Sequence, residues 1–321
     1  MKWLSDDKLD HLRTLVANPD FSSTKYTFVK ELARGGMGTV YLAEDTELKR
    51  HVAIKVLNTP DVSGELRNRM VHEAQIIARL EHPGIVPVHD VGVLPDGRVF
   101  YAMKYVRGSR LDEYTSENSS IRERLRKFQS VCDAVAFAHA HGVIHRDLKP
   151  QNIMIGSFGE VLVLDWGVAK TLGHGSARID TDWAQGTIVG TRDYMSPEQA
   201  RGEVEQLDER ADIYSLGAVL YFLLTNRPPG EAPPRSVNPA ISKTAEAICL
   251  KAMARSAGER YSSASALSAD IGHLLDAEPV SAYRESALER VSRWTSKNRF
   301  LVLLVLAYLL MRIFFAFTAR P

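Results

Sequence analysis

Two carboxylates and one carboxamide near the middle of the sequence have the types and spacing needed for metal-assisted chemistry. Asp147 and Asn152 lie in the stretch 145–152, and Asp165 follows in the tripeptide 165–167. A carboxylate can accept the proton of an attacking hydroxyl, and carboxylate and amide oxygens are ligands that Mg²⁺ prefers. We therefore expect Asp147 to orient a hydroxyl, and Asn152 and Asp165 to hold Mg²⁺ or Mn²⁺ against the phosphates of one nucleotide.

A glycine-rich segment lies upstream, where a phosphate-binding turn would be needed. Residues 32–40 contain three glycines, and the flanking stretches 26–32 and 39–43 have the composition of β-strands. Glycine lets the backbone approach phosphate oxygens closely and adopt positive φ angles without steric cost. Ordinary hairpins use the same pattern, so its meaning depends on the residues that follow.

A lysine and a glutamate come next. Residues 52–55 alternate as a strand does, with Lys55 on the face opposite Ile54, and residues 64–80 have a helical pattern that includes Glu73. The Lys55 ammonium could reach the phosphates of a nucleotide if an acid held it in place, and Glu73 is the candidate acid. The alternative for Glu73 is a solvated helix face.

Further motifs occupy residues 35–41, 82–86, 190–191, 196–198 and 212–217. Together with the stretch 145–152, they resemble a eukaryotic-type serine/threonine protein kinase, most like the bacterial membrane-associated branch. The resemblance covers residues 26–275 and implies an α+β fold of two lobes, a small β-rich N-lobe (26–102) and a larger helical C-lobe (107–275), with ATP between them. It also favours the ion pair of Lys55 with Glu73 over the solvated alternative.

The same resemblance implies which residues surround the nucleotide. Val40 and Ala53 would cover the adenine from above and Met154 from below, Met103 would stand behind it, and the backbone of residues 104–106 would bind its edge. Ordinary core packing is the competing interpretation for the apolar members. The complete predicted set is Leu32, Ala33, Arg34, Gly35, Gly36, Met37, Gly38, Val40, Ala53, Lys55, Met103, Lys104, Tyr105, Val106 and Met154.

Two further residues bear on the substrate. By resemblance, Lys149 would contact the γ-phosphate, as is typical of kinases that act on serine and threonine hydroxyls of proteins. Thr191 would hydrogen-bond near Asp147 and Lys149, although a threonine in a loop is often only a turn residue. We therefore expect protein substrates, with Lys55, Glu73 and Thr191 completing the catalytic set.

Arg146, next to the expected base, suggests regulation by phosphorylation. A phosphate on a threonine between Gly167 and Ser196 would add about −1.5 to −2 charges and could bind this guanidinium. We expect activating phosphorylation at Thr181 or Thr187, carried out in trans by a second copy of the chain.

Two acidic residues are assigned to structure. The resemblance implies a buried ion pair between Glu198 and Arg260. Asp212 fits a hydrogen bond to the backbone of the catalytic loop, and it could also act as the N-cap of the apolar helix that follows.

Three departures from the family pattern leave a rival open. Ala33 stands at the first glycine position, Trp166 replaces the usual phenylalanine, and residues 227–239 leave no room for a further helix that relatives carry. The first two support a pseudokinase, a nucleotide-binding scaffold without catalysis. A small-molecule phosphotransferase is disfavoured by the peptide-positioning segment 190–198.

Composition sets outer limits. The chain has 321 residues, 45% of them hydrophobic, enough for a sizeable core. Its net charge of +1 gives no indication of nucleic-acid binding. Cys132 and Cys249 lie in apolar helical patterns and are expected to be buried thiols rather than a disulfide pair.

The two ends of the chain carry separate predictions. Residues 1–25 are expected to form a helical extension and do not have the pattern of a secretory signal. Residues 300–319 are almost wholly apolar, and about 20 helical residues span a hydrocarbon layer of roughly 30 Å. With the basic linker 276–299 before them, they predict a single-pass membrane helix that contacts the lipid bilayer and leaves the kinase domain on the cytoplasmic face. The alternative is a buried or partner-binding helix.

Overall fold

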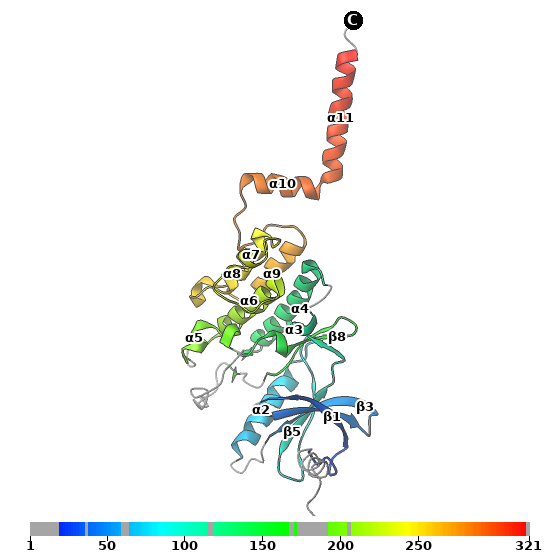
Figure 1. Ribbon diagram of the computed structural model, residues 1–321, viewed down its shortest axis with the longest axis vertical. Coiled ribbons are helices and arrows are strands. Elements are labelled where there is room, and N and C mark those ends of the chain that lie inside the picture. The colour runs from blue at the N-terminus through cyan, green and yellow to red at the C-terminus, as the bar shows by residue number, and fades with distance from the viewer. Residues whose placement is uncertain are drawn as a thin grey trace, which may run out of the picture.

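The computed structural model contains two lobes followed by two C-terminal helices (Figure 1). The small lobe combines a β-sheet with one helix, and the large lobe is mainly helical, which confirms the predicted two-lobed α+β fold. The described residues are 19–35, 38–58, 64–114, 119–166, 170–171, 192–203 and 207–318.

The small lobe is built on a five-stranded antiparallel sheet with the strand order β1-β2-β3-β5-β4. Val52, Ile54 and Val56 of β3 point into one apolar cluster, which leaves Lys55 on the opposite face as predicted. The first strand begins at the predicted residue 26 and runs past the predicted end at 32, whereas the second extends beyond the predicted 39–43 at both ends. The strands are β1 (Tyr26–Arg34), β2 (Gly38–Asp45), β3 (Arg50–Leu57), β4 (Val88–Val93) and β5 (Val99–Lys104).

Helix α2 (Glu65–Arg79) packs on this sheet and brings an acidic side chain to it. Met70 and Ala74 are buried against Val99 and Tyr101 of β5. Because side chains three and four residues apart share one helix face, this packing places Glu73 next to the sheet as well.

The large lobe surrounds the pair of helices α4 and α6, whose apolar side chains form the main core. The N-terminal boundary of α6 differs from one prediction. Helix α6 begins at Glu209, and its N-cap is Asp208, whose carboxylate accepts a hydrogen bond from the Arg210 N–H. Asp212 therefore lies inside the first turn and is not the cap. The helices are α3 (Leu111–Tyr114), α4 (Ile121–Ala140), α5 (Pro197–Ala200), α6 (Glu209–Thr225), α7 (Pro234–Val237), α8 (Lys243–Ala252) and α9 (Ala264–Leu275).

Short strands of the large lobe position the catalytic segments. Strand β7 pairs with β10 in one small sheet, while β6, β8 and β9 form another. Their bounds are β6 (Gly108–Arg110), β7 (Val143–Ile144), β8 (Ile153–Gly156), β9 (Val161–Val163) and β10 (Lys170–Thr171).

The segment after α6 is compact. The 227–239 region was expected to leave no room for a further helix, but it contains the single-turn helix α7, which begins at Pro234. Both cysteines are free and buried, as predicted.

The ordered domain continues beyond α9, because Asp270 of that helix holds the following segment. Its carboxylate accepts hydrogen bonds from the Ser281 N–H (2.8 Å), the Ser281 hydroxyl (2.8 Å) and the Ala282 N–H (3.1 Å). Val280 is buried beside them. The domain therefore extends past the residue 275 predicted as its end.

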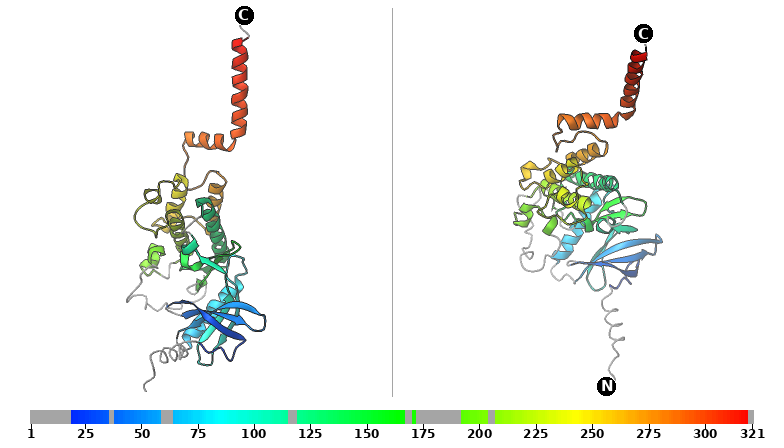
Figure 2. Two further views of the ribbon diagram at one scale, coloured as in Figure 1. Left: turned by 45° about the vertical axis from the view of Figure 1, so that its right-hand side comes forward. Right: turned by 45° about the horizontal axis from the view of Figure 1, so that its top comes forward.

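Two helices project from the large lobe on the side away from the small lobe (Figures 1 and 2). Helix α10 (Ala287–Lys297) lies within the expected linker 276–299, and α11 (Arg299–Thr318) covers most of the expected membrane span. Within the ranges described above, no helix combines the length and apolar character required to cross a bilayer. The predicted membrane span at 300–319 is therefore not supported; Arg312 interrupts its apolar run, and Ala319 lies outside the described residues.

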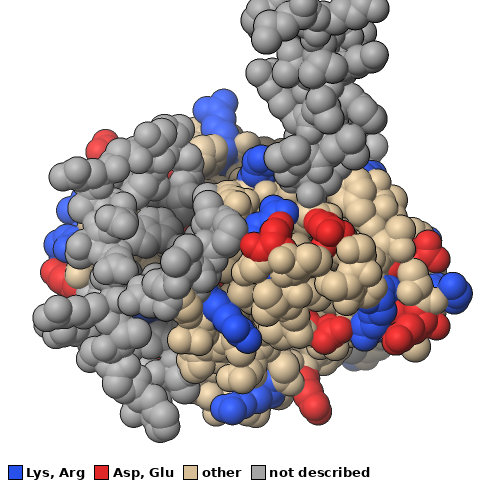
Figure 3. Space-filling view, turned by 90° about the horizontal axis from the view of Figure 1, so that it is seen from below, with Lys and Arg blue, Asp and Glu red and all other residues tan. Residues whose placement is uncertain are grey.

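The end of the small lobe remote from these helices carries charges of both signs. On the coloured surface of Figure 3, basic and acidic side chains lie side by side rather than in separate patches.

Of the expected N-terminal extension, residues 1–18 lie outside the described residues.

Candidate active site

Charged side chains from both lobes meet at Lys55. Its ammonium lies 2.6 Å from Asp165 Oδ1 and 3.4 Å from Glu73 Oε1. The Tyr101 hydroxyl, from β5, donates to the same Glu73 oxygen at 2.9 Å. Strand β3, helix α2 and the segment after β9 therefore converge on one cation, and the predicted contact of Lys55 with Glu73 is present.

The two acids differ in their electrostatics. Asp165 is about half exposed, and the desolvation that it does undergo would raise its pKa, but the close Lys55 ammonium holds that pKa below its usual value. Burial also raises the pKa of Glu73, and here the more distant ammonium does not overcome it. Burial disfavours the charge of Lys55, yet Tyr101, Asp165 and Glu73 together raise the pKa of Lys55. Lys55 is therefore matched mainly to Asp165.

The catalytic loop joins the expected base to its neighbours. Lys149 Nζ lies 2.7 Å from Asp147 Oδ2. Asn152 Nδ2 donates to the backbone oxygen of Asp147 at 2.8 Å and to its Oδ2 at 3.1 Å. Because the Leu164 N–H donates to the Asn152 carbonyl at 2.8 Å, the residue preceding Asp165 is fixed beside Asn152. The predicted base, metal ligands and phosphate-contacting lysine are thus brought together.

The backbone of this loop is held from below by Asp212 of α6. Its Oδ2 accepts from the His145 N–H and its Oδ1 from the Arg146 N–H, both at 2.8 Å. His139 Nε2 lies 2.8 Å from Oδ2. Burial would raise the pKa of Asp212, but the bonds from His139 and the loop backbone lower it. The predicted bond of Asp212 to the loop is confirmed.

Arg146 and Asp165 both have left-handed backbone conformations, with φ of 70° and 58°. Non-glycine residues adopt this region at a cost of roughly 1–3 kcal/mol, usually at sites that the surrounding structure over-determines. The Arg146 side chain is buried, and its Nε and Nη2 form no hydrogen bond within the described residues. Burial lowers the pKa of Arg146.

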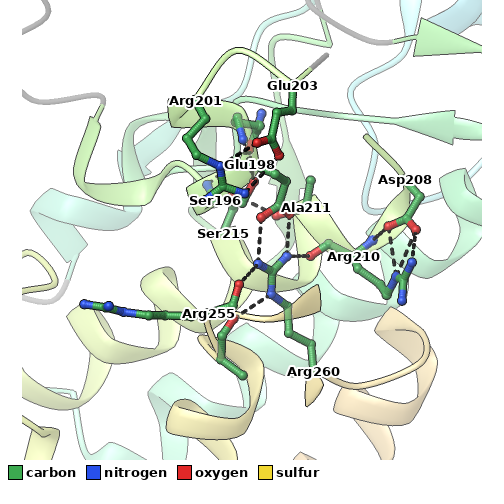
Figure 4. A network of polar contacts seen from close by, with 12 residues as sticks. Ser196, Glu198, Arg201, Glu203, Asp208, Arg210, Ala211, Ser215, Arg255 and Arg260 are labelled. Carbon is green, nitrogen blue, oxygen red and sulfur yellow. Dashed lines mark hydrogen bonds and ion pairs between the residues drawn. The ribbon is translucent and has the colours of Figure 1, made fainter. Parts of the chain in front are cut away.

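The predicted ion pair between Glu198 and Arg260 is present (Figure 4). Arg260 Nη1 and Nη2 donate to the two Glu198 oxygens at 2.6 and 2.8 Å. The same guanidinium donates to the carbonyls of Arg210, Ala254 and Arg255. Each donor of this fully buried side chain is used, so the pair fixes helix α5 to the large lobe.

The glycine-rich turn is closed by backbone and side-chain bonds. The Gly35 N–H donates to the Gly38 carbonyl at 2.9 Å, and Asn58 Nδ2 donates to the Gly35 carbonyl at 2.9 Å. A Cβ atom at Gly38 would lie 2.6 Å from the Val56 carbonyl oxygen, so only glycine fits there without a backbone shift. Gly36 and Met37 lie outside the described residues.

The apolar residues predicted to enclose the adenine fall on neighbouring elements. Ala53 on β3 pairs with Met103 on β5, and Met103 and Met154 pack against the same small cluster, which includes Leu162. Val40, on β2, pairs with Lys55. On β1, the predicted contact residues have exposed side chains: Leu32, Ala33 and Arg34.

The connection between the lobes leaves backbone groups for a ligand. The Lys104 N–H donates to the Pro87 carbonyl at 3.1 Å. Neither the N–H nor the carbonyl of Val106 takes part in a backbone hydrogen bond with the described residues. Tyr105 lies between them, with its ring 6.4 Å from that of His51.

Trp166 is fully buried in the main core. Its ring centre lies 4.6 Å from that of His145, and its indole N–H donates to the Val163 carbonyl at 3.4 Å. The larger side chain is accommodated, and Asp165 still contacts Lys55.

Some predicted residues lie outside the described part of the chain, namely Thr181, Thr187 and Thr191. Other site residues were not predicted. These are Tyr101, which bonds Glu73, Asn58, which bonds the glycine-rich turn, and Gln199, which bonds the catalytic loop. The register of β3 against β5 places Tyr101 opposite Lys55, and this register is the one signal that could have indicated Tyr101.

Comparison with known proteins places these features in a family. Residues 26–281 match the protein kinase domain. A probable serine/threonine-protein kinase of Streptomyces coelicolor is 39% identical over 282 residues, covering 80% of this chain and 41% of the relative. The serine/threonine-protein kinases PknB of Mycobacterium tuberculosis and PrkC of Bacillus subtilis are each 36% identical, covering 83% and 82% of this chain and 45% and 42% of those proteins.

Solved structures agree. The crystal structure of the PknI kinase domain of Mycobacterium tuberculosis superposes with a TM-score of 0.61 at 27% identity, covering 78% of this chain and 96% of that one. The chain spans less than half the length of the curated relatives named above.

Proposed function

Because this chain belongs to the protein kinase family, we propose that it is an ATP-dependent protein serine/threonine kinase. The observation that carries the proposal is the convergence of Lys55, Glu73 and Asp165 next to the loop that holds Asp147 and Asn152. A purely structural ion-pair network would have no reason to place a base and two metal-binding side chains beside it.

The donor set fits a metal–nucleotide complex. Asn152 uses its Nδ2 for hydrogen bonds within the loop, so its Oδ1 is left for a metal, and Asp165 is about half exposed. The described residues contain no group of three or more His, Cys, Asp or Glu side chains that could hold a metal ion. Two protein ligands suit Mg²⁺, which commonly shares its coordination with phosphates and water.

The residue roles follow from their positions. When bound, magnesium–ATP would supply the γ-phosphoryl group, and the positive charge of Mg²⁺ would neutralise the negative charge of the phosphates. Asp147 orients the substrate hydroxyl and accepts its proton, while Lys149, which already contacts that carboxylate, steadies the phosphate being transferred. Lys55 positions the other phosphates, and Glu73 with Tyr101 keeps its ammonium in place.

The surroundings of the nucleotide are proposed from the same geometry. Met103 and Met154 would contact the adenine with Val40 and Ala53, and the free backbone groups of Val106 would bind its edge. Thr191 would support Asp147 and Lys149 and thereby the preference for serine and threonine hydroxyls.

Replacement of Asp147 tests the activity. The full chain with radiolabelled ATP, Mg²⁺ and a generic protein substrate should incorporate phosphate on serine and threonine, and Asp147→Asn should lower kcat by at least about 10²-fold. Equal incorporation by both proteins would reveal a contaminant. Absence of incorporation by the unmodified chain, with ATP binding retained, would favour the pseudokinase scaffold. That rival has little support, because the catalytic side chains meet despite Ala33 and Trp166.

Regulation is a separate proposal. The buried Arg146 guanidinium, with two nitrogens that form no hydrogen bond within the described residues, suits a phosphate on Thr181 or Thr187 added in trans. When the Asp147→Asn chain is mixed with the active chain, the active chain should phosphorylate the inactive one. If alanine at both threonines leaves activity and its response to phosphatase unchanged, this regulation is wrong.

Contact with a lipid surface is proposed on the apolar side chains of the C-terminal helices. Leu288, Val291 and Trp294 of α10 are spaced along one helix face and exposed. Charged residues of the same helix form ion pairs, Glu289 with Lys243 and Arg293 with Glu285. Such a helix can lie in a membrane interface without crossing it. The chain should sediment with lipid vesicles, and a chain with aspartate at 288, 291 and 294 should remain in the supernatant.

A further inference from the structure

One side chain connects the segment expected to position the substrate with the catalytic loop. Gln199, in α5, donates from Nε2 to the backbone carbonyl of Arg146 at 2.8 Å. Its Oε1 accepts from the Ser196 N–H at 3.2 Å and from the Ser196 hydroxyl at 3.1 Å. The two ends of one amide group therefore serve two different elements.

The bond to Arg146 acts on a residue whose backbone is strained. Arg146 has a φ of 70°, and its N–H is held by Asp212 at 2.8 Å. The Gln199 amide holds the carbonyl of the same residue, so both polar groups of this residue's backbone are fixed by side chains. The carbonyl of Arg146 belongs to the peptide group that leads directly into Asp147.

The other end of the amide has an ordinary structural role. Ser196 and Gln199 form a capping box at the start of α5, in which each side chain bonds the other residue's backbone. Glutamate serves this purpose as well as glutamine, because only an acceptor oxygen is required. The capping role therefore does not need an amide nitrogen, whereas the bond to Arg146 does.

We propose that Gln199 is a positioning residue for catalysis, whose amide N–H couples the Ser196–Glu198 segment to the orientation of Asp147. The inference rests on the proposed kinase activity. It assigns to α5 a second task beyond the anchorage that Glu198 provides through Arg260. Movements of the substrate-positioning segment would reach the base through this hydrogen bond.

The variant Gln199→Glu separates the two roles. It keeps an acceptor for Ser196 but removes the donor to Arg146 and places a carboxylate against that carbonyl. We expect kcat to fall about tenfold, the effect of roughly 1.4 kcal/mol on a barrier, with the KM for ATP unchanged. Gln199→Leu, which removes both bonds, should lower kcat similarly and also reduce the melting temperature.

Gln129→Leu is the matched control. Gln129 Nε2 donates to the Ser268 carbonyl at 3.4 Å, so this change also removes an amide–carbonyl bond in the large lobe but lies between α4 and α9. It should leave kcat unchanged. Equal kcat for Gln199→Glu and the unmodified chain would overturn the proposal.

Amide hydrogen exchange gives a second measurement that does not depend on activity. Peptides covering residues 143–152 should exchange faster in Gln199→Glu than in the unmodified chain, and not in Gln129→Leu. If the unmodified chain transfers no phosphate, the proposed function fails, and the exchange rates still decide the positioning role. Identical exchange in the Gln199→Glu and unmodified chains would show that Gln199 does not hold the loop.

Discussion

Two regions hold charged groups in different ways: the site around Lys55 between the lobes, called the cleft below, and the scaffold of buried residues beneath the catalytic loop. In the cleft, Lys55 lies between two acids, one of which, Asp165, is about half exposed. Below the catalytic loop, Asp212 and the Arg260 side chain are fully buried, and their polar atoms are matched by backbone groups or side chains.

This difference follows from what each region must do. A cleft that is proposed to exchange a nucleotide needs charges that can change partners, and the half-exposed Asp165 suits that requirement. A scaffold that fixes the base needs a single arrangement, and buried charges provide one because any loss of a partner is costly. Substitutions should therefore reduce stability most in the scaffold and activity most in the cleft.

The largest loss of stability is expected for Arg260→Met. The change strands the Glu198 carboxylate and leaves three carbonyls without their donor, so the free energy of unfolding should fall by roughly 3–5 kcal/mol. Urea denaturation followed by circular dichroism measures it. The nearby exposed pair of Arg201 and Glu203, also drawn in Figure 4, offers a control. Arg201→Met should leave the unfolding midpoint where it was.

A smaller loss is expected for Asp212→Asn. One amide oxygen cannot replace two carboxylate oxygens that accept from His145, Arg146 and His139, and the new NH₂ group would face a donor. The free energy of unfolding should fall by about 2–3 kcal/mol, as for hydrogen bonds to a charged group. If the free energy of unfolding falls by less than about 1 kcal/mol, the value of one neutral hydrogen bond, other contacts hold the loop.

The sequence predicted the parts of this arrangement that depend on residue type and local spacing. Asp147, Lys149 and Asn152 lie within one short loop, so their contacts follow from its composition. The bond between Lys55 and Asp165 joins residues 110 positions apart, and only resemblance to a known fold could anticipate it.

Other features depended on geometry that composition does not determine. Asp208 and Asp212 are both plausible caps for α6, and the start of the helix at Glu209 places Asp212 inside its first turn. Tyr101 was overlooked because its partner depends on the register of β3 against β5. The membrane span was predicted from the length and apolar content of residues 300–319 and from the basic residues before them, but no helix in the described ranges is long and apolar enough to cross a bilayer.

The pH dependence should separate the two acids of the cleft. The pKa of Glu73 is raised in the folded state. Its contribution to the free energy of unfolding is therefore complete below the unfolded-state pKa of about 4.3 and is lost as the pH rises through the folded-state pKa. The destabilisation caused by Glu73→Gln should therefore be smaller at pH 7.5 than at pH 5, as measured by urea unfolding.

Asp165→Asn is the control for this comparison. The pKa of Asp165 is lowered, so its contribution is complete above the unfolded value of about 3.9 and is lost only as the pH falls through the folded value. Its destabilisation should be the same at pH 5 and pH 7.5. Parallel pH profiles for both variants would contradict the assignment of Lys55 mainly to Asp165.

The smallest expected effect on stability is that of Tyr101→Phe. The ring remains packed while the hydroxyl bond to Glu73 is lost, so the free energy of unfolding should fall by about 1 kcal/mol. Tyr26→Phe removes a similar hydroxyl bond, to Asp90, elsewhere in the same sheet. Both should lose similar stability, but only Tyr101→Phe should raise the KM for ATP, because only its hydroxyl helps to hold the acid that orients Lys55. Equal KM values would mean that Lys55 is positioned by Asp165 alone, and that Glu73 with Tyr101 belongs to the scaffold rather than to the cleft.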